Sequence, residues 1–78
     1  MFAGVRTLSD LPTGEKCIVD YLTSKGADKR RMFDLGIIPG TEIKALFKSP
    51  FGGITAYHIR GAIIAIRLED AEKIFIKN

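Results

Sequence analysis

Cysteine and histidine are nearly absent from this chain, which has Cys17 and His58 as its single copies of each. One cysteine cannot form an internal disulfide, so a disulfide scaffold is excluded and a reducing cytosol is favoured. The sequence has no CxxC or HxxxH spacing and no dense carboxylate loop, so zinc and calcium signatures are missing. We therefore expect neither a bound metal nor another cofactor.

Long apolar runs are missing as well. The longest covers residues 62–66, which is five residues, whereas a helix that spans a bilayer needs about 20. The first residues contain no apolar stretch of signal-peptide length. These absences predict a soluble, cytoplasmic protein that reaches a membrane only through a partner. Weak association of copies of the chain into a homo-oligomer is left open.

Neither sign of charge dominates: 12 basic and 9 acidic residues leave a net charge of +3. This surplus allows weak attraction to acidic surfaces but forms no clustered basic stripe, so a nucleic-acid partner is not expected. With 46% hydrophobic residues and three prolines, the chain has enough apolar material for a core. Because 78 residues fit one core, we expect a single domain over residues 1–78.

Short stretches of alternating apolar and polar residues make up most of the sequence. They predict strands over residues 16–22, 42–48, 54–60, 62–68 and 74–77. A helix is predicted over Ala27–Leu35, with Met32 and Leu35 on the face that points into the core. A one-turn helix is predicted over Glu69–Lys73. About five short strands with glycine-marked reversals and one short inserted helix are typical of a mainly β, small, partly open barrel.

The alternation also divides the strand residues between two faces. Two sets of three residues each share a face: Cys17, Val19 and Tyr21 in one strand, and Ile43, Ala45 and Phe47 in the next. Large apolar residues are predicted opposite the core as well: Phe2, Leu22, Leu46, Ile54, Ile63 and Phe75. A small barrel cannot bury both sides of every strand. These residues therefore either form an exposed apolar patch or are covered by the helix and the N-terminal segment.

The stretch Arg30–Gly40 combines a helix end with a tight turn. Gly36 follows the predicted helix at the point where a left-handed residue commonly ends it, a conformation that costs glycine little. Pro39 and Gly40 fit the central positions of a type II turn, in which proline presets φ and glycine accepts a positive φ. These features are architectural and indicate no chemistry by themselves.

Four further segments follow in a fixed order: Ser49–Gly53, Tyr57–Gly61, Ile64–Arg67 and Glu69–Ala71. Together with Arg30–Gly40 they resemble the ferrous iron transport protein A family, over residues 8–76. The resemblance implies a small cytoplasmic SH3-like barrel that accompanies a membrane ferrous iron permease with a cytosolic GTPase domain. It implies a non-catalytic accessory protein that supports or regulates ferrous iron uptake by binding this permease.

The residues that match the family look structural: Asp34, Leu35, Gly36, Pro39, Gly40, Arg60 and Gly61. For contact with the permease we expect the exposed part of the helix: Lys29, Arg30, Arg31 and Phe33. The alternative is that these residues only form a solvated, charged helix face. Arg67 is expected to pair with Glu69 or Asp70.

Three other interpretations remain open. SH3-like barrels also occur in RNA-binding proteins, which predicts binding that weakens steeply with salt, but the aromatic residues here do not cluster with lysine and arginine. A detached SH3-like domain of an iron-dependent repressor is the second, and it normally follows a helix-turn-helix region that this sequence lacks. An enzyme would require Cys17 and His58 to meet as a nucleophilic pair with a third, orienting group.

Overall fold

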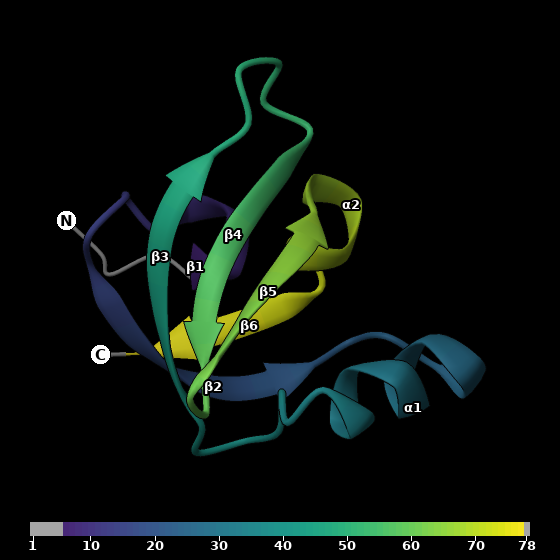
Figure 1. Ribbon diagram of the computed structural model, residues 1–78. Helices are drawn as coiled ribbons and strands as arrows, with labels where there is room; N and C mark the ends of the chain where they lie inside the picture. Colours follow the sequence, from purple (N-terminus) through teal and green to yellow (C-terminus); the bar gives the residue numbers. More distant parts are fainter. Residues whose placement is uncertain (1–5, 78) are drawn as a thin grey trace, which may run out of the picture.

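A computed structural model describes residues 6–77, and Phe2 lies outside this range. The chain folds into one curled sheet with short helical connections (Figure 1). Its strands are β1 (Arg6–Thr7), β2 (Lys16–Leu22), β3 (Glu42–Lys48), β4 (Ile54–Ile59), β5 (Ala62–Arg67) and β6 (Ile74–Lys77). Its helical segments are the 3-10 turn η1 (Leu8–Asp10), α1 (Gly26–Asp34) and the single turn α2 (Leu68–Ala71).

Neighbouring strands are all antiparallel, in the order β1-β6-β2-β3-β4-β5. The outer strands β1 and β5 are not bonded to each other, so the barrel is partly open. The fold class predicted from the sequence, a mainly β, partly open barrel with one short inserted helix, is confirmed. The structure adds β1, which escaped prediction because two residues are too few to show an alternating pattern.

Two β-bulges change which side chains face the core. The register slips by one residue between Val19 and Tyr21 in β2, and between Ala45 and Phe47 in β3. An extra residue reverses the alternation beyond it. Tyr21 and Phe47 are therefore exposed, at 44% and 60%, and do not share the buried face of the residues before the bulge. The prediction that each strand keeps one face along its whole length was wrong at these two positions.

The core lies inside the curl of the sheet and is closed by the chain segments around η1 and α1. Its members are Leu8, Leu11, Cys17, Val19, Met32, Ile37, Ile43, Ala45, Tyr57, Ile59, Ile66, Ala71, Ile74 and Ile76. Tyr57 is buried with its hydroxyl group directed at the Leu8 carbonyl oxygen, 3.4 Å away. The buried phenol thereby ties β4 to η1, and a polar partner offsets the cost of burying its oxygen.

Helix α1 contributes one side chain, Met32, to this core. Leu35 was predicted to join it but is 36% exposed, because it is the C-cap residue and the chain reverses at Gly36. Ile37, just beyond the reversal, is fully buried instead. The helix is therefore fixed to the barrel mainly through Met32 and Ile37.

Candidate functional site

The end of α1 is built from a helix stop followed by a turn that is bonded to β2. Gly36 has a φ of +89°, as expected for a left-handed helix stop. Its carbonyl oxygen accepts a hydrogen bond of 2.9 Å from the Thr41 hydroxyl group. The Thr41 amide closes the turn on the Ile38 carbonyl oxygen, and the Gly40 amide donates to the Val19 carbonyl oxygen of β2. This turn fixes the position of α1 relative to the sheet.

The turn between β4 and β5 lies against this helix stop. Arg60 and Gly61 both have positive φ, at +50° and +84°, which is the pattern of a type I′ hairpin turn. The Arg60 side chain crosses Gly36 so closely that a Cβ atom there would lie 2.6 Å from its Cδ atom. Gly36 and Arg60, predicted as structural motif residues from distant segments, therefore pack against each other, and Gly61 completes the turn that carries Arg60.

The other predicted motif residues lie around this contact. Asp34 is the last residue of α1 and is exposed, as is Leu35 after it. Pro39 is exposed in the turn that Gly40 completes, where the Gly40 φ of +94° agrees with a type II turn.

Arg31 has a different role from its neighbours on α1. Its guanidinium group lies 3.1 Å from the Asp70 carboxylate on α2 and 4.0 Å from that of Asp28. Arg67 was expected to pair with Glu69 or Asp70, but within residues 6–77 it forms neither ion pair, and Asp70 pairs with Arg31 of α1 instead. Arg31 therefore links two helical segments, and its side chain is not wholly available to a partner.

Lys29, Arg30 and Phe33 are three exposed residues within one turn of α1, and we call them the α1 surface. The ammonium group of Lys29 lies 5.6 Å from the centre of the Phe33 ring, within the range of a cation–π contact. Phe33 is 43% exposed, although a phenyl ring has no polar group to hydrate. The α1 surface thus combines two cations with an aromatic ring, a composition suited to contact with an acidic, partly apolar partner.

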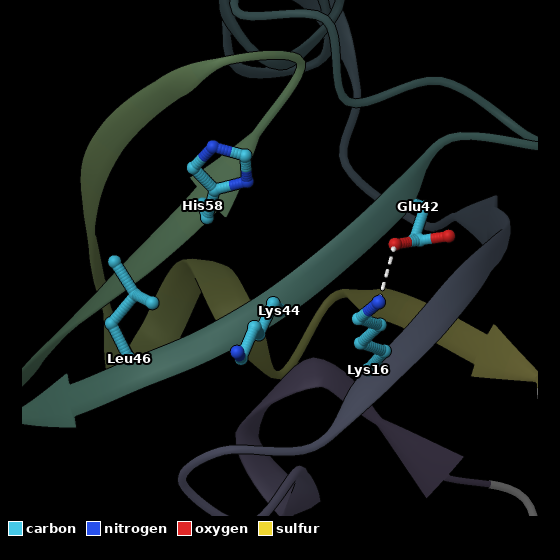
Figure 2. A pocket seen from close by; sticks show the side chains of 5 residues that line it. All are labelled: Lys16, Glu42, Lys44, Leu46 and His58. Atoms are coloured by element: carbon cyan, nitrogen blue, oxygen red, sulfur yellow. Dashed lines mark ion pairs between the residues drawn. The ribbon is translucent and has the colours of Figure 1, made fainter.

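A second feature lies on the outer face of the sheet, where β2, β3 and β4 form a groove of about 370 Å³ (Figure 2). It is lined by Lys16, Glu42, Lys44, Leu46 and His58. Lys16, Lys44 and His58 are directly opposite one another on successive strands, and Glu42 forms an ion pair of 3.7 Å with Lys16. This row was not predicted from the sequence, because charged residues on three strands become neighbours only once the register is known.

The described residues assemble neither a nucleophilic pair nor a group of metal ligands. Cys17 is buried, whereas His58 is exposed on the outer face of the sheet, so the two do not meet. Burial raises the pKa of the Cys17 thiol to about 11, which suppresses the reactive thiolate. Within residues 6–77, no three His, Cys, Asp or Glu side chains converge as metal ligands would. No helix in this part of the chain is long and apolar enough to cross a membrane.

Comparison with known families identifies the fold. The FeoA domain model matches residues 6–78. The chain belongs to the FeoA family. This confirms the family expected from the sequence, a family with relatives named for ferrous iron transport.

A curated relative shows the FeoA domain in a larger setting. It is the Fe(2+) transport protein A/Fe(2+) transporter FeoB fusion protein of Porphyromonas gingivalis, which is 27% identical over 70 residues. The match covers 90% of this chain but 8% of the fusion protein. In that protein, a FeoA domain and a FeoB transporter share one polypeptide.

Solved FeoA structures have the same fold. The FeoA protein of Chlorobium tepidum is 29% identical, with a TM-score of 0.87 over 92% of this chain and 69% of that one. FeoA of Stenotrophomonas maltophilia, solved in complex with zinc and described as a prokaryotic SH3 domain protein, is 26% identical. Its TM-score is 0.80 over 92% of this chain and 89% of that one. The SH3-like barrel predicted from the sequence is thus the fold of this FeoA-family chain.

Proposed function

We propose that this FeoA-family protein is a non-catalytic, cytoplasmic accessory protein that binds a ferrous iron permease of the FeoB type and supports or regulates Fe²⁺ uptake. The observation that carries this proposal is the fusion of FeoA and FeoB domains in the relative from Porphyromonas gingivalis. A covalent linkage gives two modules a high effective concentration. A separate FeoA chain must supply the same proximity through a binding surface of its own.

The α1 surface is the proposed contact. Aromatic and arginine side chains are enriched at the energetic centres of interfaces, and Phe33 and Arg30 offer both within one helical turn. Met32 is the one α1 side chain taken up by the core, so binding at Lys29, Arg30 and Phe33 requires no rearrangement of the barrel. Such a protein acts by contacts, favouring one conformation of the permease over another.

The test is binding to the purified ferrous iron permease of the same host, in detergent or lipid discs. Arg30→Glu and Phe33→Ala are each expected to weaken binding by at least about tenfold. Lys48→Glu and Phe51→Ala are the matched controls, because both residues are exposed and belong to the β3 end and the following loop, far from α1 (Figure 1). They should leave binding unchanged.

Two results would overturn the proposal. One is the absence of any binding to the permease by a folded wild-type protein. The other is preferential binding of RNA that weakens steeply as salt rises, which would favour the nucleic-acid interpretation of the barrel. Equal losses in all four variants would leave permease binding standing but would remove the α1 surface as its site.

A further inference from the structure

Strand β5 ends the sheet with an unpaired edge. It bonds to β4 on one side, and within residues 6–77 no strand bonds to its other side (Figure 1). The opposite edge of the sheet is β1, which is described over Arg6–Thr7. β5 has six residues, contains no proline, and is uncharged until Arg67. An exposed edge of this kind is a template for another strand.

The phase of the β4–β5 hydrogen bonds shows which groups point outward. The two-residue turn at Arg60–Gly61 makes Ile59 and Ala62 the first hydrogen-bonded pair, and such pairs then alternate along an antiparallel ladder. The bond from the Leu68 amide to the Gly53 carbonyl oxygen, at 3.0 Å, continues the same phase beyond the strand. The register between the strands has no bulge that would shift it.

It follows that the amide and carbonyl groups of Ile63, Ala65 and Arg67 point away from β4. None of these three amides donates to a turn, loop or cap carbonyl within the described part of the chain. Their side chains also face outward, and Ile63 is 67% exposed. The edge thus offers three free peptide groups beside an exposed isoleucine, and Arg67 is the one charged residue in the strand that could protect it.

We propose that this edge pairs with β5 of a second copy of the chain, antiparallel about a two-fold axis at Ala65. In this register Ala65 lies opposite its own counterpart, and Ile63 lies opposite Arg67 of the second copy. All three free peptide groups of each chain are then used, and each such pair exchanges two hydrogen bonds. A shift that puts the two Arg67 residues opposite each other would instead oppose like charges, which is unfavourable.

Charge supports the same arrangement. A two-fold axis at Ala65 brings the turn that follows β4 in one copy, which carries Arg60, toward the start of α2 in the other. That start carries the exposed carboxylate of Glu69, next to Asp70, which already pairs with Arg31 of its own chain. The apolar part of the Arg67 side chain can cover Ile63 of the second copy while its charge stays in water.

The proposal concerns a surface separate from the α1 surface and goes beyond accessory binding to a permease. Because one strand pair is marginal in water, the association is expected to be weak and concentration-dependent, half complete in the high micromolar to millimolar range. A symmetric pair also presents two α1 surfaces at once.

Analytical ultracentrifugation of the purified chain over this concentration range is the test. Ala65→Pro removes an amide that donates to nothing in the described chain, and Ile63→Lys adds a charge to the edge. Each is expected to raise the dimer dissociation constant by at least about tenfold. Ile38→Lys makes the same chemical change at an exposed isoleucine outside the edge and should leave the constant unchanged.

The wild-type chain gives a second readout that does not depend on a variant folding. Amide hydrogen exchange at Ile63, Ala65 and Arg67 should slow as protein concentration rises, while exchange at exposed amides in α1 should not. A chain that stays monomeric at millimolar concentration overturns the proposal. A dimer also overturns it if the β5 variants leave its dissociation constant unchanged and exchange at the β5 amides does not slow with concentration. If the chain is monomeric but Ala65→Pro abolishes binding to the permease, the edge belongs to a strand of that partner and the second copy is ruled out.

Discussion

Gly36 and Arg60 come from segments that are distant in the sequence, yet the Arg60 side chain lies where a Gly36 side chain would be. A Cβ atom on Gly36 would approach the Arg60 Cδ atom to 2.6 Å, which real contacts essentially never reach. Gly36 also has a φ of +89°, which disfavours any residue with a Cβ atom. Two separate physical reasons therefore require glycine here, and they can be distinguished.

The first prediction is that Gly36→Ala destabilises the fold by about 1–2 kcal/mol through its positive φ, and by more to the extent that the exposed Arg60 side chain is held in place. In an Arg60→Ala background the steric part is removed, so the same substitution should cost only the backbone part, about 1–2 kcal/mol. Urea unfolding of the two single variants and the double variant measures the difference as a coupling energy. A coupling energy of zero would mean that Arg60 moves aside freely and that φ alone requires glycine.

The second prediction separates two neighbouring arginines. Arg31→Glu breaks the 3.1 Å ion pair with Asp70 and puts a third carboxylate near Asp70 and Asp28. Because Arg31 remains about half exposed to solvent, a loss of roughly 1 kcal/mol of stability is expected, and it should shrink as salt rises. Arg30→Glu makes the same charge change at a residue with no ion pair in the described chain, so its melting temperature should match that of the wild type. Equal losses in both variants would show that the Asp70 contact contributes nothing.

The sequence predicted the strands well because their alternation is a local property. The limits of β2, β3 and β6 were predicted correctly, and those of β4 and β5 to within one residue. Alternation cannot reveal where a bulge interrupts it, since a bulge is defined by the opposing strand. Tyr21 shows this: it leaves the core and stacks on Phe75 of β6 with ring centres 4.7 Å apart.

The candidate sites were less predictable for the same reason. The helix residues Lys29, Arg30, Arg31 and Phe33 could be proposed from charge density, but only the folded chain separates Arg31 from the rest by pairing it with Asp70. Of the apolar residues predicted opposite the core, Ile54 and Ile63 are well exposed, and Leu46 and Phe75 are half-buried. The prediction was wrong for Leu22, which packs against the core because the bulge in β2 reverses the alternation before it. The free edge of β5 likewise depends on strand order, which no local pattern encodes.

The third prediction concerns alkaline pH. Burial raises the pKa of the Cys17 thiol from 9.0 to about 11, and burial also raises the pKa of the Tyr57 hydroxyl group. Between pH 9 and about pH 11 the unfolded chain releases the thiol proton while the folded chain retains it. The free energy of unfolding must therefore fall as pH rises through this range. The loss due to Cys17 should approach about 2–3 kcal/mol at the upper end of this range. Below pH 9 the contribution is fully present.

Urea unfolding as a function of pH measures this loss, and Cys17→Ala is the control. The variant is less stable at neutral pH because it leaves a small cavity, but its stability should fall less steeply above pH 9. Parallel curves for the wild type and the variant would mean that the thiol ionises equally in the folded and unfolded chains. The slope that remains in the variant is the contribution expected from Tyr57.

The fourth prediction uses the row of basic groups in the groove of Figure 2. Lys44 is half-buried and lies directly between Lys16 on β2 and His58 on β4, so two ammonium groups oppose each other across the ladder. Lys44→Glu replaces this repulsion with attraction and should stabilise the fold by about 0.5–1 kcal/mol at low salt. Lys48→Glu makes the same charge change opposite the neutral Thr55 and should have little effect.

Thermal unfolding at low and high salt distinguishes two explanations of any gain in stability. Relief of the local repulsion stabilises Lys44→Glu alone, and this gain fades as salt rises. A general response to the lower net charge stabilises both variants. A loss of stability in Lys44→Glu would instead mean that the apolar part of the lysine side chain, packed in the groove beside Leu46, outweighs the repulsion at its end.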